Sequence, residues 1–248
     1  MDKRAFIKAV RGWESAAVAD ALVSDPDLSR YVDKIGKTPL HHCAEINPKK
    51  AGLQVTDSIA TAKALLDAGA DVNAVRVVID DGEKFSATPL WYAVAWGKNL
   101  ALARLLLETG AHPDNNATGS SIWDQDLMMA ELLRSHGGNI NHKFRGETPL
   151  LRTVRARRLR LLNWLTENGA DINAKDSTGY TALHHAVKGS HTLAEVESLL
   201  KHGARPNAKA KGGATPLTLA QDAGKTRLVE LMRLHLATEK LRSAVMHG

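Results

Sequence analysis

The feature that most constrains the fold of this chain is a Thr-Pro-Leu motif that returns at nearly constant intervals. It stands at Thr38, Thr88, Thr148 and Thr215, and recurs as Thr-Ala-Leu at Thr181. The last two intervals are 33 and 34 residues. A fixed period of about 20 to 50 residues is typical of repeat proteins, whose units pack mainly against their neighbours. The 248 residues are therefore predicted to form an array of small, similar units.

A second motif, close to Gly-Ala-Asp-x-Asn-Ala, follows several copies of the first after about 20 residues. Its clear copies are GADVNA at 69–74, GAHPDN at 110–115, GADINA at 169–174 and GARPNA at 203–208. One more copy, GGNINH at 137–142, has no clear Thr-Pro-Leu before it. The natural equivalent there is Ser121, which lies 33 residues after Thr88.

The residue types in both motifs have physical reasons. A threonine hydroxyl accepts from the free backbone N–H groups at a helix start, and proline fits the first helical position because it lacks an N–H. Leucines at i, i+3 and i+4, as in ALARLLLETG at 101–110, give a second helix one apolar face. Glycine then ends that helix in the left-handed conformation. Each period therefore predicts two short helices and a turn.

The 33-residue period, Thr-Pro-Leu-His-x-Ala and Gly-Ala-Asp-x-Asn-Ala together resemble the ankyrin repeat, over roughly residues 30 to 236. The resemblance implies an all-α ankyrin-repeat solenoid, in which stacked helix-turn-helix units carry β-turn or hairpin fingers. We expect a single ankyrin-repeat domain over 1–248. It would comprise N-terminal capping helices at 1–33, about six full or partial repeats at 34–237, and a C-terminal helical cap to 248.

Two departures from the period locate an insertion and a loss. The interval from Thr38 to Thr88 is 50 residues, with about nine extra residues between the two helices and about seven in the turn. The turn sequence VRVVIDDGEKF alternates around Asp81-Gly82, which predicts an elongated hairpin finger near 75–87. The unit at Ser121 is about six residues short. We expect a shortened first helix there, with Trp123 filling the gap.

Composition narrows the class of protein. A single cysteine excludes an intramolecular disulfide framework and a multi-cysteine zinc site. The charged N-terminus lacks the apolar core of a signal peptide, and no run of 18 apolar residues is present. We therefore expect a cytoplasmic protein without a membrane span. No nucleophile elbow, phosphate loop or dinucleotide fingerprint is found, so we expect neither an enzyme nor a cofactor.

Two histidine pairs, His41-His42 and His184-His185, are the first candidates for metal ligands. Adjacent residues on a helix point about 100° apart, whereas chelating pairs need i, i+3 or i, i+4 spacing. We therefore expect no metal site. In the ankyrin consensus, the first histidine of each pair makes framework hydrogen bonds. Cys43 aligns with a small alanine position and is expected to be a buried thiol.

The net charge of +6 is concentrated in one segment. Residues 143–160 hold seven basic residues and one acid, and the rest of the chain is neutral. The basic segment is consistent with a solvated face or with a docking patch for an acidic partner. Nucleic acid is the weaker alternative, because a duplex or strand would need basic residues across several repeats.

The resemblance implies binding through the turn tips and the exposed side of the first helices. The positions that match in this chain are Lys34, Ile35, Glu45, Lys84, Phe85, Trp96, Thr118, Ser120, Phe144, Arg145, Glu147, Arg155, Thr178, Tyr180 and Lys188. Aromatic residues and arginine dominate binding hot spots. The predicted protein-binding residues are therefore Phe85, Trp96, Phe144, Arg145, Arg155, Tyr180 and Lys188.

These residues predict a monomeric, non-catalytic protein-interaction module that binds an unidentified partner protein, such as one with an acidic patch. The alternative is an inhibitor or immunity-type protein that blocks the cleft of an enzyme, with the finger at 75–87 as the inserted element.

Overall fold

Each repeat of the computed structural model is a pair of helices that begins where the sequence places a cap. Thr88 and Thr148 accept a hydrogen bond on their hydroxyl groups from the backbone three residues later, and Pro89 and Pro149 occupy the first helical position. Glycines with φ between 87° and 95° follow the second helices, as at Gly69 and Gly110. The structure describes residues 1–80, 83–143, 146–189 and 192–246.

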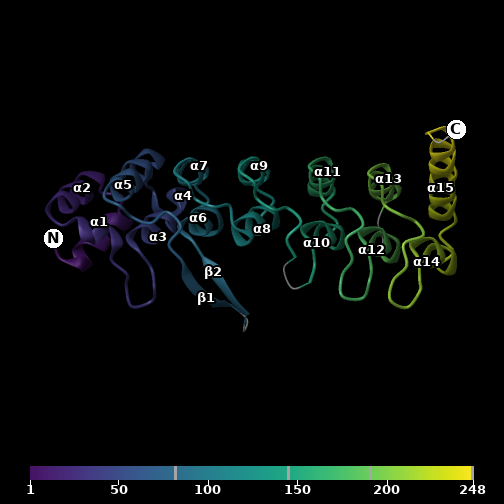
Figure 1. Ribbon diagram of the computed structural model, residues 1–248, viewed down its shortest axis with the longest axis horizontal. Helices are drawn as coiled ribbons and strands as arrows, with labels where there is room; N and C mark the ends of the chain where they lie inside the picture. Colours follow the sequence, from purple (N-terminus) through teal and green to yellow (C-terminus); the bar gives the residue numbers. More distant parts are fainter. Residues whose placement is uncertain (81–82, 144–145, 190–191, 247–248) are drawn as a thin grey trace. The chain divides into compact units, whose positions relative to one another are not determined.

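The chain forms two units, Met1–Asn139 and Ile140–Gly248. In the first unit, the first helices of successive repeats lie in one row and the second helices in another (Figure 1). Helix α3 packs between α1 and α6, and α5 packs between α2 and α7. The elements of this unit are α1 (Lys3–Arg11), α2 (Ser15–Ser24), η1 (Pro26–Arg30), α3 (Pro39–Ala44), α4 (Pro48–Ala51), α5 (Val55–Asp67), β1 (Arg76–Asp80), β2 (Glu83–Ala87), α6 (Pro89–Tyr92), the π-helical turn η2 (Ala93–Gly97), α7 (Leu100–Glu108), α8 (Asn115–Trp123) and α9 (Leu127–Ser135).

The second unit repeats the same plan. Helix α12 packs between α10 and α14, and α13 packs between α11 and α15. The last helix, α15, runs on for 21 residues. The elements are α10 (Pro149–Arg155), α11 (Leu159–Glu167), α12 (Ala182–Lys188), α13 (Leu193–Lys201), α14 (Pro216–Asp222) and α15 (Thr226–Met246).

Asparagines of the second motif connect neighbouring repeats within each unit. Asn73 donates from Nδ2 to the carbonyl of Gly110 at 3.0 Å and accepts from the backbone N–H of His112 at 2.9 Å. Asn173 makes the same two bonds to Gly203 and Arg205 in the second unit. Each asparagine side chain therefore hydrogen-bonds two backbone groups of the next repeat and joins the two repeats.

The elongated hairpin finger is confirmed. Strands β1 and β2 pair antiparallel, from Arg76↔Ala87 at the base to Asp80↔Glu83 at the end, so the connection falls at 81–82 as predicted. The Arg76 side chain anchors the base, because Nε donates to the carbonyl of Ile35 at 2.9 Å and Nη1 donates to the Tyr92 hydroxyl. The residues inserted between the helices of the same repeat include the short helix α4.

The shortened repeat differs from the prediction. Its first helix is not reduced: α8 spans nine residues and begins at the cap Asp114, whose carboxylate accepts from the backbone N–H of Ala117. The missing residues belong to the finger, because only Thr109–Asp114 separate α7 from α8. Trp123 does not fill a gap in the core, since 49% of its surface is exposed.

Candidate functional site

The first histidine of each pair belongs to the framework. Nδ1 of His41 accepts from the backbone N–H of Thr38 at 3.1 Å, and Nε2 lies 3.2 Å from the carbonyl oxygen of Ala87 in the next repeat. His184 repeats this arrangement with Thr181 at 3.0 Å and Ala214 at 3.2 Å. Both imidazoles therefore close a helix start and hold the following repeat. Burial is the largest cause of the lowered pKa of His41, which falls to about 4.

The second histidine of each pair connects a first helix to its own finger. Nε2 of His185 lies 2.8 Å from the carboxylate of Asp176, and His42 meets Asp33 at the same distance. Burial acts to raise the pKa of Asp176. Hydrogen bonds from Thr178, His185 and the Tyr180 backbone outweigh it and lower the pKa to about 2. These contacts brace the finger from which Thr178 and Tyr180 project.

Cys43 is fully buried at the small position of α3, as predicted. Burial raises the pKa of its thiol to about 12, so the group stays a thiol at neutral pH. Within the part of the chain that the structure describes, no group of three or more His, Cys, Asp or Glu side chains is placed to hold a metal ion. Within the same part, no helix is both long and apolar enough to span a membrane.

The second unit contains an open groove of about 850 Å³ between its first helices and its fingers. One wall comes from the end of α10 and from α12, and the other from the tips of the fingers at 177–180 and 210–214. Three of the predicted binding residues, Arg155, Tyr180 and Lys188, line this groove together. The sequence prediction therefore brought together residues from two repeats that the fold places side by side.

Tyr180 is fixed in place by its neighbours. Its ring stacks on the imidazole of His184 with centroids 4.9 Å apart and planes inclined by 15°. The ammonium of Lys188 lies 5.1 Å from the ring centroid, which is within the range of a cation–π contact. Both ring neighbours stand on α12, so the helix holds the tyrosine of the finger against itself.

Two further cations of the groove were not among the seven predicted binding residues: Arg157, which belongs to the basic segment at 143–160, and Lys211. Arg157 ends α10 in the left-handed conformation, with φ of 57°, which turns it away from the helical path. Lys211 is held at the groove because its backbone N–H donates to the carbonyl of Thr178 at 3.1 Å. A β-carbon on Gly179, where φ is 84°, would lie 2.8 Å from that same nitrogen of Lys211. Glycine there allows the two fingers to approach closely.

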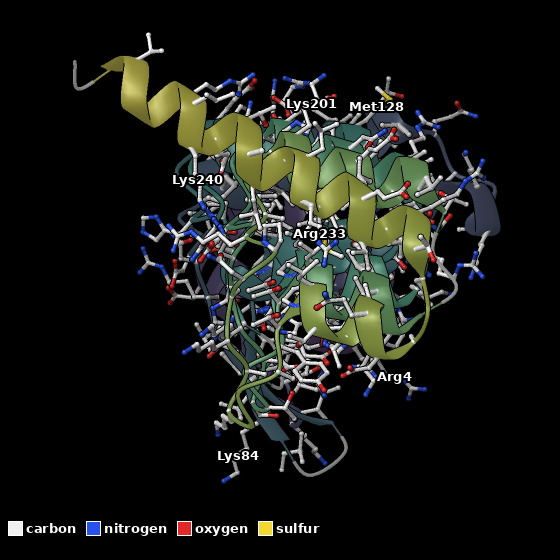
Figure 2. The ribbon with its side chains drawn as sticks, turned by 90° about the vertical axis from the view of Figure 1, so that its right-hand side faces the viewer. Arg4, Lys84, Met128, Lys201, Arg233 and Lys240 are labelled. Atoms are coloured by element: carbon white, nitrogen blue, oxygen red, sulfur yellow. The ribbon has the colours of Figure 1, made fainter. Side chains whose placement is uncertain are left out.

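The first unit places Trp96 and Phe85 differently. Trp96 follows α6 in the π-helical turn η2 and is 61% exposed. Phe85 is half-buried on β2, with its ring 5.1 Å from that of Trp91. Phe85 therefore packs the hairpin against Trp91. Val77 and Ile79 on β1, in contrast, are 62% and 66% exposed. Figure 2 shows Lys84 near the end of the same hairpin.

Other predicted positions have different environments. Phe144 and Arg145 lie outside the described residues. Thr118, expected at an exposed position, is fully buried in α8 because that helix starts earlier than predicted. Arg155 pairs with Glu147 at the start of α10 and remains 54% exposed. Direct roles in binding stay predictions for all seven predicted binding residues.

Models of known protein families match the chain in two regions. The model described as "Ankyrin repeats (3 copies)" matches residues 159–240, and the model described as "Ankyrin repeat" matches residues 35–76 and 86–119. Together these matches span more than half of the chain.

Curated relatives and solved structures point the same way. A "Putative ankyrin repeat protein" of Rickettsia bellii (strain RML369-C) is 32% identical over 149 residues, which is 58% of this chain and 62% of that protein. The 2-5A-dependent ribonuclease of Homo sapiens is 41% identical over 80 residues, which is 32% of this chain and 11% of that protein. The chain thus spans less than two thirds of the length of either relative.

Two crystal structures share the fold at 24% sequence identity. The ankyrin repeat domain of human ASB11 has a TM-score of 0.63, with 93% of this chain and 96% of that chain covered. The ankyrin repeat domain of Bcl-3 has a TM-score of 0.70, with 92% and 97% covered. The all-α solenoid fold predicted from the repeat is thereby confirmed.

Proposed function

The chain belongs to the ankyrin-repeat family, whose repeats are in general protein-interaction modules, and we propose that it is a non-catalytic module that binds a partner protein. Binding would use the surface formed by the first helices and the fingers. The observation that carries the proposal is the groove in the second unit, where Arg155, Tyr180 and Lys188 meet. Tyrosine and arginine in such a setting have the chemistry of binding hot spots.

Trp96 gives the same proposal a second support, in the first unit. A side chain of this size that is 61% exposed leaves apolar surface in water, which binding would remove. Its ring centroid is 6.4 Å from that of Tyr92, which is buried and ties the ring position to the core. Trp96 is thus a large, exposed aromatic group whose ring lies near the buried Tyr92.

We expect Trp96→Ala to weaken partner binding by about 30-fold or more, because a hot-spot aromatic contributes about 2 kcal/mol or more. The immobilised chain would capture proteins from a lysate of its source organism, and mass spectrometry would identify them. The dissociation constant of each purified candidate would then be measured by calorimetry. Tyr180→Ala is expected to act in the same direction for any partner that reaches the groove.

Met128→Ala is the matched control. Met128 lies on the second helix α9, is 70% exposed, and is labelled in Figure 2. It presents apolar surface away from the proposed binding side, so this change should leave affinity within about twofold. A partner that binds Trp96→Ala and Tyr180→Ala as tightly as the unchanged chain, but loses affinity with Met128→Ala, would overturn the surface assignment.

The second candidate function is occlusion of an enzyme cleft by the hairpin. Val77 and Ile79 favour it, because two exposed β-branched residues on one strand give the finger an apolar face. Among the described residues, the base of the hairpin is tied to the stack through Arg76 and Phe85. The finger is thus a firmly anchored element with an apolar face free for contact.

Removing residues 79–80 and 83–84 tests this candidate. The deletion brings the pair Val78↔Phe85 next to the same two connecting residues, and it keeps the anchors at Arg76 and Phe85. If the hairpin is inserted into a partner enzyme, inhibition of that enzyme should fall at least tenfold while the circular dichroism spectrum and unfolding midpoint stay close to those of the full chain. Unchanged inhibition would leave only the first-helix surface as the contact.

A further inference from the structure

We propose that the groove of the second unit binds an acidic peptide segment of a partner protein, with carboxylates of the segment meeting Arg157, Lys188 and Lys211. The proposal rests on the proposed protein-binding function and adds the chemistry of the occupant. Three features of the groove support it: its volume, its positive charge, and the covered ring of Tyr180.

The charge of the groove has one sign. Arg155, Arg157, Lys188 and Lys211 line it, and among its lining residues there is no Asp or Glu. Of these cations, Arg155 is paired with Glu147. Within the described parts of the chain, Arg157 and Lys211 make no side-chain hydrogen bond or ion pair, so both charges are available to a ligand.

The acids near the groove are already engaged. Asp176 holds His185 and accepts from Thr178 and the Tyr180 backbone within its own finger. A pair of charges that is only partly exposed interacts more strongly than one in open water, because the protein lowers the local dielectric. Asp176 therefore does not compete with an incoming carboxylate for Arg157 or Lys211.

Lysines elsewhere on the fingers do not extend this patch into a continuous track. Lys143 donates from Nζ to the carbonyl of Lys175 at 3.0 Å, and Lys175 donates in the same way to Lys209 at 2.9 Å. These ammonium groups bind backbone oxygens of the next finger. Lys143 and Lys175 are thus engaged with the backbone, whereas Arg157 and Lys211 of the groove are not.

The state of Tyr180 favours a peptide over a nucleic-acid strand. Proteins that bind single strands stack bases on open aromatic faces. Here His184 covers one face of the ring, and the Lys188 ammonium lies over the ring as well. These neighbours leave less of the ring for base stacking, whereas the Tyr180 hydroxyl has the chemistry to hydrogen-bond with a carboxylate or a peptide group.

The size and the walls suit an extended segment. A volume of about 850 Å³ lies in the upper part of the range of about 300 to 1,000 Å³ that is usual for ligand pockets. Small residues on the walls, Gly189, Ala210 and Gly212, let a peptide backbone come close. The groove can therefore hold several residues, with Arg157 and Lys211 among the side chains that line it.

A pair of labelled peptides tests the proposal on the full chain. The probe is a fluorescein-labelled 12-residue peptide of alternating Glu and Ala, and its partner carries Gln in place of every Glu. We expect the Glu peptide to bind at least tenfold more tightly by fluorescence polarisation in 50 mM salt, with affinity falling as salt is raised. Equal affinity for the two peptides would overturn the proposal.

The double variant Arg157→Gly with Lys211→Ala removes the two free cations. Glycine suits the positive φ of residue 157, so the fold is not put at risk. We expect at least a tenfold loss of Glu-peptide affinity. The matched control is Arg233→Ala with Lys240→Ala, which removes the same charge from α15 (Figure 2) and should change affinity less than twofold. An equal loss in both variants would show a non-specific charge effect and overturn the groove as the site.

A 12-nucleotide single-stranded DNA is the competing probe. Tighter binding of this strand than of the Glu peptide, with the same sensitivity to the double variant, would assign the groove to nucleic acid and overturn the peptide proposal. Equal affinity for the two peptides, or tighter binding of DNA, would not decide the general protein-binding function. The lysate-capture test addresses that function separately, because it also depends on the Trp96 surface of the first unit.

Discussion

Acidification from pH 6.5 to pH 4 is expected to remove about 3 kcal/mol of folding stability from the first unit through His41 alone. The imidazole is fully buried, and burial is the main reason why its pKa falls from 6.5 to about 4. The nearby charge of Lys37 acts in the same direction. The folded state therefore resists a proton that the unfolded chain accepts.

The hydrogen bonds of His41 explain why protonation disrupts the fold. Nδ1 accepts from the backbone N–H of Thr38, and Nε2 lies within donating distance of the Ala87 carbonyl. A proton on Nδ1 would remove the acceptor that closes the start of α3. Because the folded pKa is depressed, the stabilising contribution is complete above pH 6.5 and is lost as the pH falls through about 4.

The variant His41→Gln isolates this effect. Glutamine at the third helical position can still accept from the Thr38 N–H, as in a capping box, but it does not titrate. Urea unfolding at several pH values, followed by tryptophan fluorescence, would report mainly on the first unit, which holds four of the five tryptophans. The unchanged chain should lose about 3 kcal/mol more than His41→Gln between pH 6.5 and pH 4.

A variant that destabilises the same unit without removing a titrating group provides the control. Val10→Ala deletes buried methyl groups from α1 and should lower stability by about 1 to 2 kcal/mol at every pH. Its stability should follow the same slope with pH as that of the unchanged chain. If His41→Gln also keeps that slope, the buried histidine is not the acid-sensitive element.

The sequence predicted the repeat framework well because its signals are local. Threonine caps, proline at the first helical position and glycine stops each depend on a few neighbouring residues, and the structure places them as expected. The position of the hairpin connection within 76–87 was predicted correctly, because Asp81-Gly82 and the alternation of the strands are also local signals. The repeat at Asp114 was misplaced because its cap is an aspartate without the proline and leucine of the motif. A search for helix caps of any type would have found it.

The candidate groove was only partly predictable. Tyr180, Arg155 and Lys188 stand at positions defined by the repeat, so alignment to the motif was sufficient. Arg157 and Lys211 depend on three-dimensional features: a positive φ at the end of α10 and the close approach of two fingers at Gly179. The sequence held a weak signal for the positive φ of Arg157. The corresponding position after α14 is Gly224, which also has a positive φ. The state of each cation, paired or free, follows from side-chain contacts that no repeat motif encodes.

The tight packing at Gly97 leads to the second large effect. Gly97 ends η2 and is buried, and a β-carbon there would lie 2.4 Å from the carbonyl oxygen of Ala44. It would also meet the carbonyl oxygens of Tyr92 at 3.4 Å and Ile46 at 3.5 Å. All three are backbone atoms, so no side-chain rotation can relieve the contact. The two repeats would have to separate, or η2 would have to unwind.

We therefore expect Gly97→Ala to lower the free energy of unfolding of the first unit by about 3 kcal/mol, at the upper end of the usual cost of overpacking. Gly119→Ala is the matched control. Gly119 lies inside α8, and a β-carbon there meets nothing within 4 Å. Alanine favours the helix by about 1 kcal/mol over glycine, so this change should raise stability. The midpoints of urea unfolding at pH 7 should move in opposite directions for the two variants. A midpoint for Gly97→Ala at or above that of the unchanged chain would contradict the close approach of α3 and η2, because only that approach makes the added methyl group costly.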